Sequence, residues 1–218
     1  MATTYLNLVN DVLVRLREST VASVTENDYS SLIGKLVNDA KREVEDAWNW
    51  ECLRTTLTVP TVASTSGYTL TGSGDRFRIE QVYNDTSDYT LESRPVKFFN
   101  DALILTANPK SGEPHYYNVN GVNSSGDILV RLFPIPDAVY SVKFSGFIPE
   151  AELSAGSDTT KLSKAAIVAL AWAKAIEERG EDGGINVSSQ YAVAKQALSD
   201  AIAIEAGRRT DEVTWFWT

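Results

Sequence analysis

The chain has 218 residues, 43% of them apolar and 22% charged, which suits one folded domain or one domain carrying an insertion. Its 29 acidic and 20 basic side chains give a formal net charge of −9, which argues against a broad phosphate-binding surface. One cysteine and one histidine exclude a disulfide framework within the chain and a zinc site of several cysteines and histidines. We therefore expect no metal site and no cofactor.

The sequence contains no segment typical of export or membrane insertion. Residues 1–10 have neither a basic region nor an apolar core, so we expect no secretory signal peptide. The longest strongly apolar stretch, residues 165–175, is interrupted by Lys174 and is far shorter than the ~20 residues of a membrane-spanning helix. These features favour a soluble protein of a reducing compartment with no membrane partner.

Two N-terminal segments have the apolar period of an α-helix. Residues 5–18 place apolar side chains on one stripe, and a second helix is expected from Thr25, as N-cap, to Trp48. The second pattern is the strongest in the chain and continues for about five turns. Each helix has one apolar face and needs a packing partner. The apolar positions of the second helix are Tyr29, Leu32, Ile33, Leu36, Val37, Ala40, Val44, Ala47 and Trp48.

After Trp50 the pattern changes to short β-strands separated by turn residues such as those at 71–75, 108–112 and 123–127. Such spacing is typical of a small antiparallel sandwich or barrel. The expected strands cover residues 55–59, 67–70, 77–83, 102–106, 115–119, 128–133 and 140–147.

Helical periodicity returns in two alanine-rich segments, residues 162–176 and 186–206, separated by the glycine-rich stretch at 180–184. Twelve alanines between Ala165 and Ala206 favour close helix packing. We therefore predict an α+β fold with three parts. Residues 1–52 and 156–207 form a four-helix bundle, residues 53–155 an inserted antiparallel β-sandwich or barrel, and residues 208–218 an extended C-terminal tail.

Few residues are candidates for catalysis, and each has a simpler interpretation. His115 would need a nucleophile or a carboxylate brought near by the fold, so a half-exposed strand histidine is favoured. Cys52 is interpreted as a small buried hydrophobic residue. The acidic residues within 177–182 lack the spacing of an EF-hand and fit a solvated helix end. We predict that the protein is not an enzyme.

Two tryptophans mark the expected junction between helix and sheet. On the helical stripe Trp48 faces inward, whereas Trp50 lies roughly 200° around the same helix at about 100° per residue. We therefore interpret Trp48 and Trp50 as a structural junction that joins the two modules.

The C-terminal tail carries three adjacent large aromatic residues. They cannot all face one core in an extended chain, because successive side chains alternate sides. Exposed to water, they would form an apolar patch of the kind that marks an interface. Two interpretations stay open: the tail docks on another subunit, or it folds back on its own bundle. The residues concerned are Arg208, Arg209, Val213, Trp215, Phe216 and Trp217.

The order of these elements resembles the head-to-tail adaptor proteins of short-tailed bacteriophages, also called connector proteins or tail tubular proteins A. Residues 6–13 are similar to the opening helix of that family. Residues 37–44 are similar to its second helix, which runs into the tryptophan pair and then into Leu57-Thr58-Val59-Pro60. The resemblance covers the whole chain in order and size, and its motifs are packing motifs.

This resemblance implies a ring, usually of twelve copies, beneath the portal of the capsid, with double-stranded DNA passing through its lumen. It implies that the fourth helix and the tail, residues 208–218, bind the portal protein and that the β domain faces the tail nozzle protein. It also implies a location in the virion neck after assembly in the host cytoplasm. Residues 1–50, 51–155 and 156–218 are each net negative, which suits DNA passage without specific binding.

Two rival functions remain open at this point. In the first, the β domain is a carbohydrate-binding or adhesion module of a phage tail. In the second, a hydrolase uses His115 with an acidic partner. The first would present aromatic side chains to a glycan, namely Tyr68, Phe77, Tyr83, Tyr89, Phe98 and Phe99.

Overall fold

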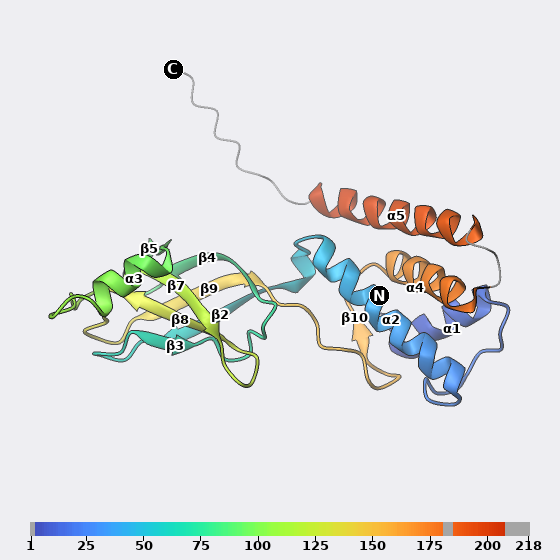
Figure 1. Ribbon diagram of the computed structural model, residues 1–218, viewed down its shortest axis with the longest axis horizontal. Coiled ribbons are helices and arrows are strands. Elements are labelled where there is room, and N and C mark those ends of the chain that lie inside the picture. Colours follow the sequence, from blue (N-terminus) through green and yellow to red (C-terminus); the bar gives the residue numbers. More distant parts are fainter. Residues whose placement is uncertain (1–2, 181–184, 208–218) are drawn as a thin grey trace, which may run out of the picture. The chain divides into compact units, whose positions relative to one another are not determined.

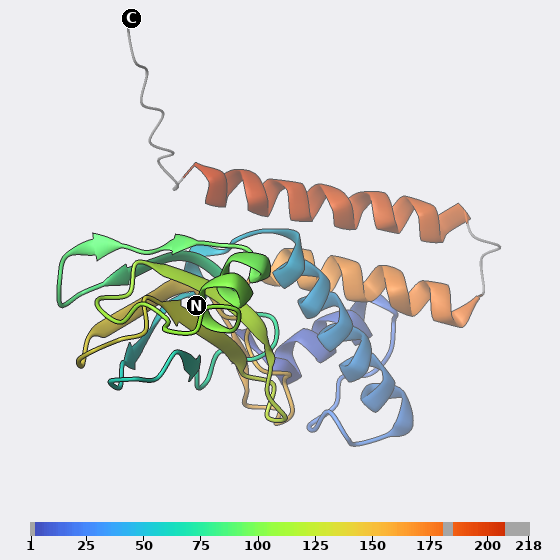
Figure 2. The same cartoon turned by 60° about the vertical axis from the view of Figure 1, so that its left-hand side comes forward.

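The computed structural model describes residues 3–180 and 185–207 and divides into two compact units (Figure 1). The helical unit comprises residues 1–52 and 150–218, and the β unit comprises residues 53–149. The predicted α+β class is confirmed, because helices dominate one unit and sheets the other (Figure 2).

Four helices build the described part of the helical unit: α1 (Tyr5–Arg15), α2 (Asp28–Ala47), α4 (Lys164–Arg179) and α5 (Ile185–Ala206). Helix α4 contacts α1, α2 and α5, and α1 also contacts α2. Figures 1 and 2 both show α5 running alongside α4. Because α4 has neighbours on several sides, small alanines are buried around it, as the alanine-rich sequence predicts.

Capping side chains explain where these helices begin. The predicted N-cap of α2, Thr25, is wrong by two residues. Asn27 caps the helix instead: its side chain accepts a hydrogen bond from the Ser30 amide at 2.7 Å, and the Ser30 hydroxyl accepts one from the Asn27 amide at 3.2 Å. Helix α4 starts at the cap Ser163 and ends at Gly180, whose φ of 64° lies in the left-handed region that glycine adopts readily.

A short antiparallel pair that the sequence pattern missed closes the helical unit. Strand β1 (Thr3–Thr4) pairs with β10 (Thr159–Thr160). The Tyr5 amide extends the pairing by donating to the carbonyl oxygen of Asp158 at 2.7 Å. Strands of two residues have no period that a sequence could display.

The β unit contains two four-stranded sheets, preceded by the short 3₁₀ turn at Glu51–Leu53. The first sheet has the order β2 (Arg54–Pro60), β9 (Ser141–Phe147), β4 (Arg78–Asn84), β5 (Tyr89–Thr90) and is antiparallel. The second has the order β3 (Gly67–Thr69), β8 (Ile128–Phe133), β7 (Tyr116–Val122), β6 (Glu92–Ser93), with β6 parallel to β7. The described strands form open sheets and no closed barrel, so that part of the prediction is wrong.

Both sheets contribute to one hydrophobic core. Alternate residues of β8 (Ile128, Val130 and Leu132) are buried against residues from the first sheet such as Val142 and Phe144. This alternation is the period of a strand with one apolar face. It explains why the predicted strand at 128–133 matches β8.

One expected strand is wrong. Residues 102–106 do not form a strand, because helix α3 (Val96–Leu103) covers the first part of this run. Pro95 stands at the N-cap, and Phe99 is buried in edge-on ring contacts with Phe98 and Phe133. A short apolar run has no period that distinguishes a strand from a helix, and here packing of the aromatic rings favours the helix.

Candidate functional site

The six residues predicted to bind the portal all lie outside the described residues, which end at Gly207. They are Arg208, Arg209, Val213, Trp215, Phe216 and Trp217. The candidate site that the structure describes is therefore helix α5, which leads into this tail, and the surfaces around it.

Trp50 is buried in the helical unit, with 4% of its surface exposed. Its indole Nε1 donates a hydrogen bond to the carbonyl oxygen of Val44 at 2.7 Å. The expectation that Trp50 continues the helix is wrong, because α2 ends at Ala47 and Trp48 has an extended backbone with φ −153°. The side chain folds back on the last turn of α2 and satisfies a carbonyl group there. Whether Trp48 and Trp50 join the two modules stays a prediction.

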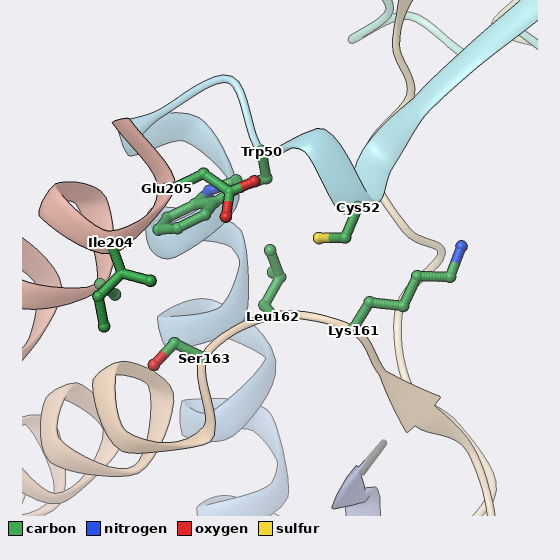
Figure 3. Close-up of a pocket in the computed structure, with 8 residues that line it drawn as sticks. Trp50, Cys52, Lys161, Leu162, Ser163, Ile204 and Glu205 are labelled. Atoms are coloured by element: carbon green, nitrogen blue, oxygen red, sulfur yellow. The ribbon is translucent and has the colours of Figure 1, made fainter. Parts of the chain in front are cut away.

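The last turn of α5 is anchored to the residues that follow α2. Glu205 is buried in this turn, and its carboxylate accepts a hydrogen bond from the Glu51 amide at 2.8 Å. Figure 3 shows Glu205 and Ile204 of α5 around a hollow of about 220 Å³. The sequence did not single out Glu205, because a glutamate in an alanine-rich helix usually faces water. The other residues lining the hollow are Trp50, Cys52, Lys161, Leu162, Ser163 and Ala201.

Cys52 is exposed, so its interpretation as a buried residue is wrong. Its thiol borders the same hollow (Figure 3). Partial burial of the thiol raises the pKa of Cys52, and the nearby carboxylates of Glu205 and Glu150 raise it further. Because the thiolate is the nucleophilic form, these surroundings disfavour nucleophilic chemistry at neutral pH.

His115 is exposed and lies immediately before β7. Its ring packs against Tyr89 at 4.7 Å between ring centroids and against Tyr116 at 6.5 Å. Among residues 3–180 and 185–207, no group of three or more His, Cys, Asp or Glu side chains could hold a metal ion. The same residues contain no helix long and apolar enough to cross a membrane.

Most aromatic residues of the β unit serve packing. Phe77 belongs to the buried core, and Phe98 and Phe99 pack edge-on around Phe133. Two of the six aromatic residues considered for glycan binding lie elsewhere: Tyr83 and Tyr89 border an open, polar hollow of about 500 Å³. The other residues around it are Gln81, Asn84, Asp85, Asp88, Thr90 and Ser145.

Helix α5 is apolar on more than one side. Ala194 is buried on the inner side, whereas Val193 and Ile204 are 51% and 62% exposed. A second, mostly apolar hollow of about 280 Å³ is lined by residues of α5, α2 and α4. Val193 and Ile204 are eleven positions apart and lie on the same side of the helix, so this side of α5 has the character of an interface element. The hollow, named the α5 groove, is lined by Glu43, Val44, Ala166, Leu170, Tyr191, Ala194, Lys195 and Leu198.

Tyr191 ties α5 to α4, because its hydroxyl donates to a carboxylate oxygen of Glu177 at 2.5 Å. Burial, together with the hydrogen bond to Glu177, raises the pKa of Tyr191 from 10.0 to about 12.

The raised pKa of Tyr191 predicts a pH-dependent stability. Since folding favours the neutral phenol, the stabilisation of the fold by this group is fully present below pH 10.0 and disappears as the pH rises through about 12. We expect the melting temperature of wild type to fall more steeply over this range than that of Tyr191→Phe. Circular dichroism melts measure this, with Tyr116→Phe as control; parallel curves for wild type and Tyr191→Phe would contradict it.

The comparisons with known proteins point to one family. The family model described as SU10 adaptor protein matches residues 3–215, nearly the whole chain and both of its units. Among curated proteins, none matches the chain. The match agrees with the resemblance to phage head-to-tail adaptors that the order of elements predicts.

Proposed function

The chain belongs to the SU10 adaptor protein family, a family of structural phage adaptors found in the virion neck, and we propose that it forms an oligomeric ring between the portal and the tail nozzle. The genome passes through this ring without specific binding. We propose twelve copies in the ring, assembly in the host cytoplasm and no enzymatic activity.

One observation carries this proposal within the family: α5 exposes apolar side chains on the side that its own unit does not cover. Val193 and Ile204 lie on that side, while Ala194 packs inward. Exposed apolar surface of this kind supports an interface with a partner. Because α5 leads directly into residues 208–218, helix and tail together form the portal-binding element, with Arg208, Arg209, Val213, Trp215, Phe216 and Trp217 as its contacts.

The charge of the chain supports the passage of DNA. The net charge of −9 repels phosphates, and a ring that DNA must slide through should not bind it. We assign the β unit to the contact with the nozzle protein, because the helical unit carries the portal-binding element.

Deleting Thr214–Thr218 should abolish docking on the portal ring and leave the fold intact. The deletion removes all three terminal aromatics, which would supply most of the apolar contact area. Electron microscopy of the chain with its phage's purified portal ring measures the docking, and circular dichroism checks the fold. The matched control replaces Thr210 and Thr214 with alanine and should dock like wild type. Undiminished docking of the folded deletion variant would refute the role of the tail.

A second function, glycan binding by the β unit, has one supporting observation. Tyr83 and Tyr89 lie beside polar side chains at the open hollow on the first sheet. All five tryptophans lie in residues 1–52 and 150–218, so tryptophan fluorescence would not report directly on this hollow. Glycan-array binding that disappears in Tyr83→Ala would favour this function. Absence of binding in wild type would remove it.

A further inference from the structure

We propose that the segment of residues 215–217 lies on the α5 groove of the same chain, with one aromatic side chain inside it, before the chain meets the portal, so that the groove keeps the tail from premature contacts. The proposal rests on the proposed function, because it assigns a resting place to the segment that docks on the portal. Four features of the molecule support it: the lining of the groove, the length of the tail, the charge at the rim, and the linkage of tail and groove in one chain.

The groove has the right chemistry for an aromatic side chain. Its lining is mostly apolar. Val44, Ala166 and Ala194 are buried, so the apolar surface open to a docked side chain comes from the partly exposed Leu170 of α4 and Leu198 of α5. Its volume of about 280 Å³ exceeds the small voids usual in close-packed interiors. Filling it with apolar atoms would restore the contacts that its walls lack.

The tail is long enough to reach the groove. At a rise of 1.5 Å per residue, Leu198 and Ala194 lie about 13 Å and about 20 Å along α5 from Gly207. An extended chain spans at most about 3.3 Å per residue, so the segment from Gly207 to Trp215 covers up to about 26 Å. The tail therefore reaches the groove after one reversal of direction.

Two charged residues line the groove, Glu43 and Lys195; Glu43 is already paired with Lys174, so Lys195 is the charge that can complement the tail. Lys195 is exposed at the rim and makes no ion pair with other residues in the described part of the chain. Asp211 and Glu212 precede the aromatic segment by only a few residues. With the aromatics in the groove, one of these carboxylates lies within reach of the lysine ammonium group.

Linkage favours the tail of the same chain over that of a second copy. A short flexible linker gives an effective concentration on the order of millimolar, far above that of free chains in dilute solution. The uncovered aromatics would otherwise form an apolar patch on the free protein. The groove and the portal then compete for residues 215–217, so the tail leaves the groove only when the chain meets the portal.

Disulfide trapping tests the proposal in the full chain. In a Cys52→Ser background, the pair Leu198→Cys and Thr218→Cys places one thiol in the groove and one at the tail end. The control pair, Asp200→Cys and Thr218→Cys, has the same tail thiol and an exposed position on α5. We expect mild oxidation to form the intramolecular disulfide at least tenfold faster in the groove pair, and Trp215→Ala with Trp217→Ala to remove the difference. Equal rates, or mainly disulfides between chains, would overturn the proposal.

A second measurement uses variants that keep the apolar residues of the groove lining intact. Lys195→Glu reverses the rim charge and should repel Asp211 and Glu212, so that chymotrypsin cleaves at Phe216 several-fold faster than in wild type. Lys35→Glu makes the same change on an exposed position of α2 away from the groove and should cleave like wild type. Identical cleavage of all three proteins would overturn the proposal.

These experiments separate the groove from the proposed function. Both use the isolated chain, whereas docking requires the portal ring. If the groove disulfide forms faster but the chain does not dock on the portal ring, the portal-binding role of the tail is rejected and the groove proposal stands. If the chain docks but both cysteine pairs form disulfides at equal rates, the groove proposal is rejected and the portal-binding role stands.

Discussion

Glu45→Ala should lower the free energy of unfolding by about 3–5 kcal/mol, because it leaves the Lys41 ammonium group buried without its counterion. Lys41 and Glu45 are only 3% and 1% exposed, and the Lys41 Nζ lies 2.6 Å from the Glu45 Oε1. The same Nζ donates to the carbonyl oxygens of Glu150 and Ala151 at 3.1 and 3.0 Å. The Glu45 Oε1 also accepts a hydrogen bond from the Glu150 amide at 3.1 Å.

Urea unfolding followed by tryptophan fluorescence measures this loss, since all five tryptophans belong to the residues of the helical unit. The matched control is Asp11→Asn, which removes a partner of Lys164 from a pair that is half-exposed. That change should cost less than about 1 kcal/mol, because water screens exposed pairs. A double replacement, Lys41→Met with Glu45→Leu, should recover much of the loss by removing both buried charges. A loss below about 1 kcal/mol in Glu45→Ala would contradict the argument.

The buried pair shows where sequence patterns fail for this fold. The apolar stripe of α2 correctly predicts the burial of Ile33, Val37 and Val44. Lys41 and Glu45 are charged and four residues apart, a spacing typical of a solvent-exposed helix face. They are buried because the chain re-enters the helical unit at Glu150 and lies against α2, a contact between residues more than a hundred positions apart.

Asn38, one turn earlier in α2, is a second polar residue that binds the returning segment. Its amide group donates to the carbonyl oxygen of Leu153 at 2.9 Å and accepts from the Leu153 amide at 3.0 Å. This two-way hydrogen bond holds the returning segment in register along the helix. Periodicity reports one element at a time, so it identifies the apolar face of α2 and misses the polar row that binds a distant segment.

For the candidate site, the sequence predicted which segments are distinctive, but it did not predict the burial and the contacts of single residues. It identified helix 186–206 and the aromatic tail as the distinctive C-terminal features. It assigned Cys52 to the interior, although the turn at Glu51–Leu53 leaves this residue exposed. It did not predict that Glu205 accepts the Glu51 amide, because that hydrogen bond depends on how the end of α5 meets the end of α2.

Phe144→Ala should destabilise the β unit by about 3–5 kcal/mol, the usual cost of removing a buried phenyl ring from a packed core. Phe144 is fully buried in β9, opposite Leu57 of β2 and Val82 of β4, and its ring meets Tyr117 of the second sheet edge-on at 6.0 Å between centroids. Because β9 is an inner strand and the ring contacts the second sheet, the cavity opens between the two sheets. Val119→Ala, a truncation at an exposed position of β7, should change stability by less than about 0.5 kcal/mol.

Urea unfolding recorded by hydrogen–deuterium exchange of the strand amides and by tryptophan fluorescence distinguishes the two units in this variant. Because the tryptophans belong to residues 1–52 and 150–218, fluorescence follows the helical unit, whereas exchange in peptides from β2, β4, β8 and β9 follows the β unit. An inserted domain with its own core should lose stability alone, so Phe144→Ala should shift the exchange transition and leave the fluorescence transition in place. An equal shift of both transitions would show that the units unfold together, and no shift in either would contradict the role of Phe144 in the shared core of the two sheets.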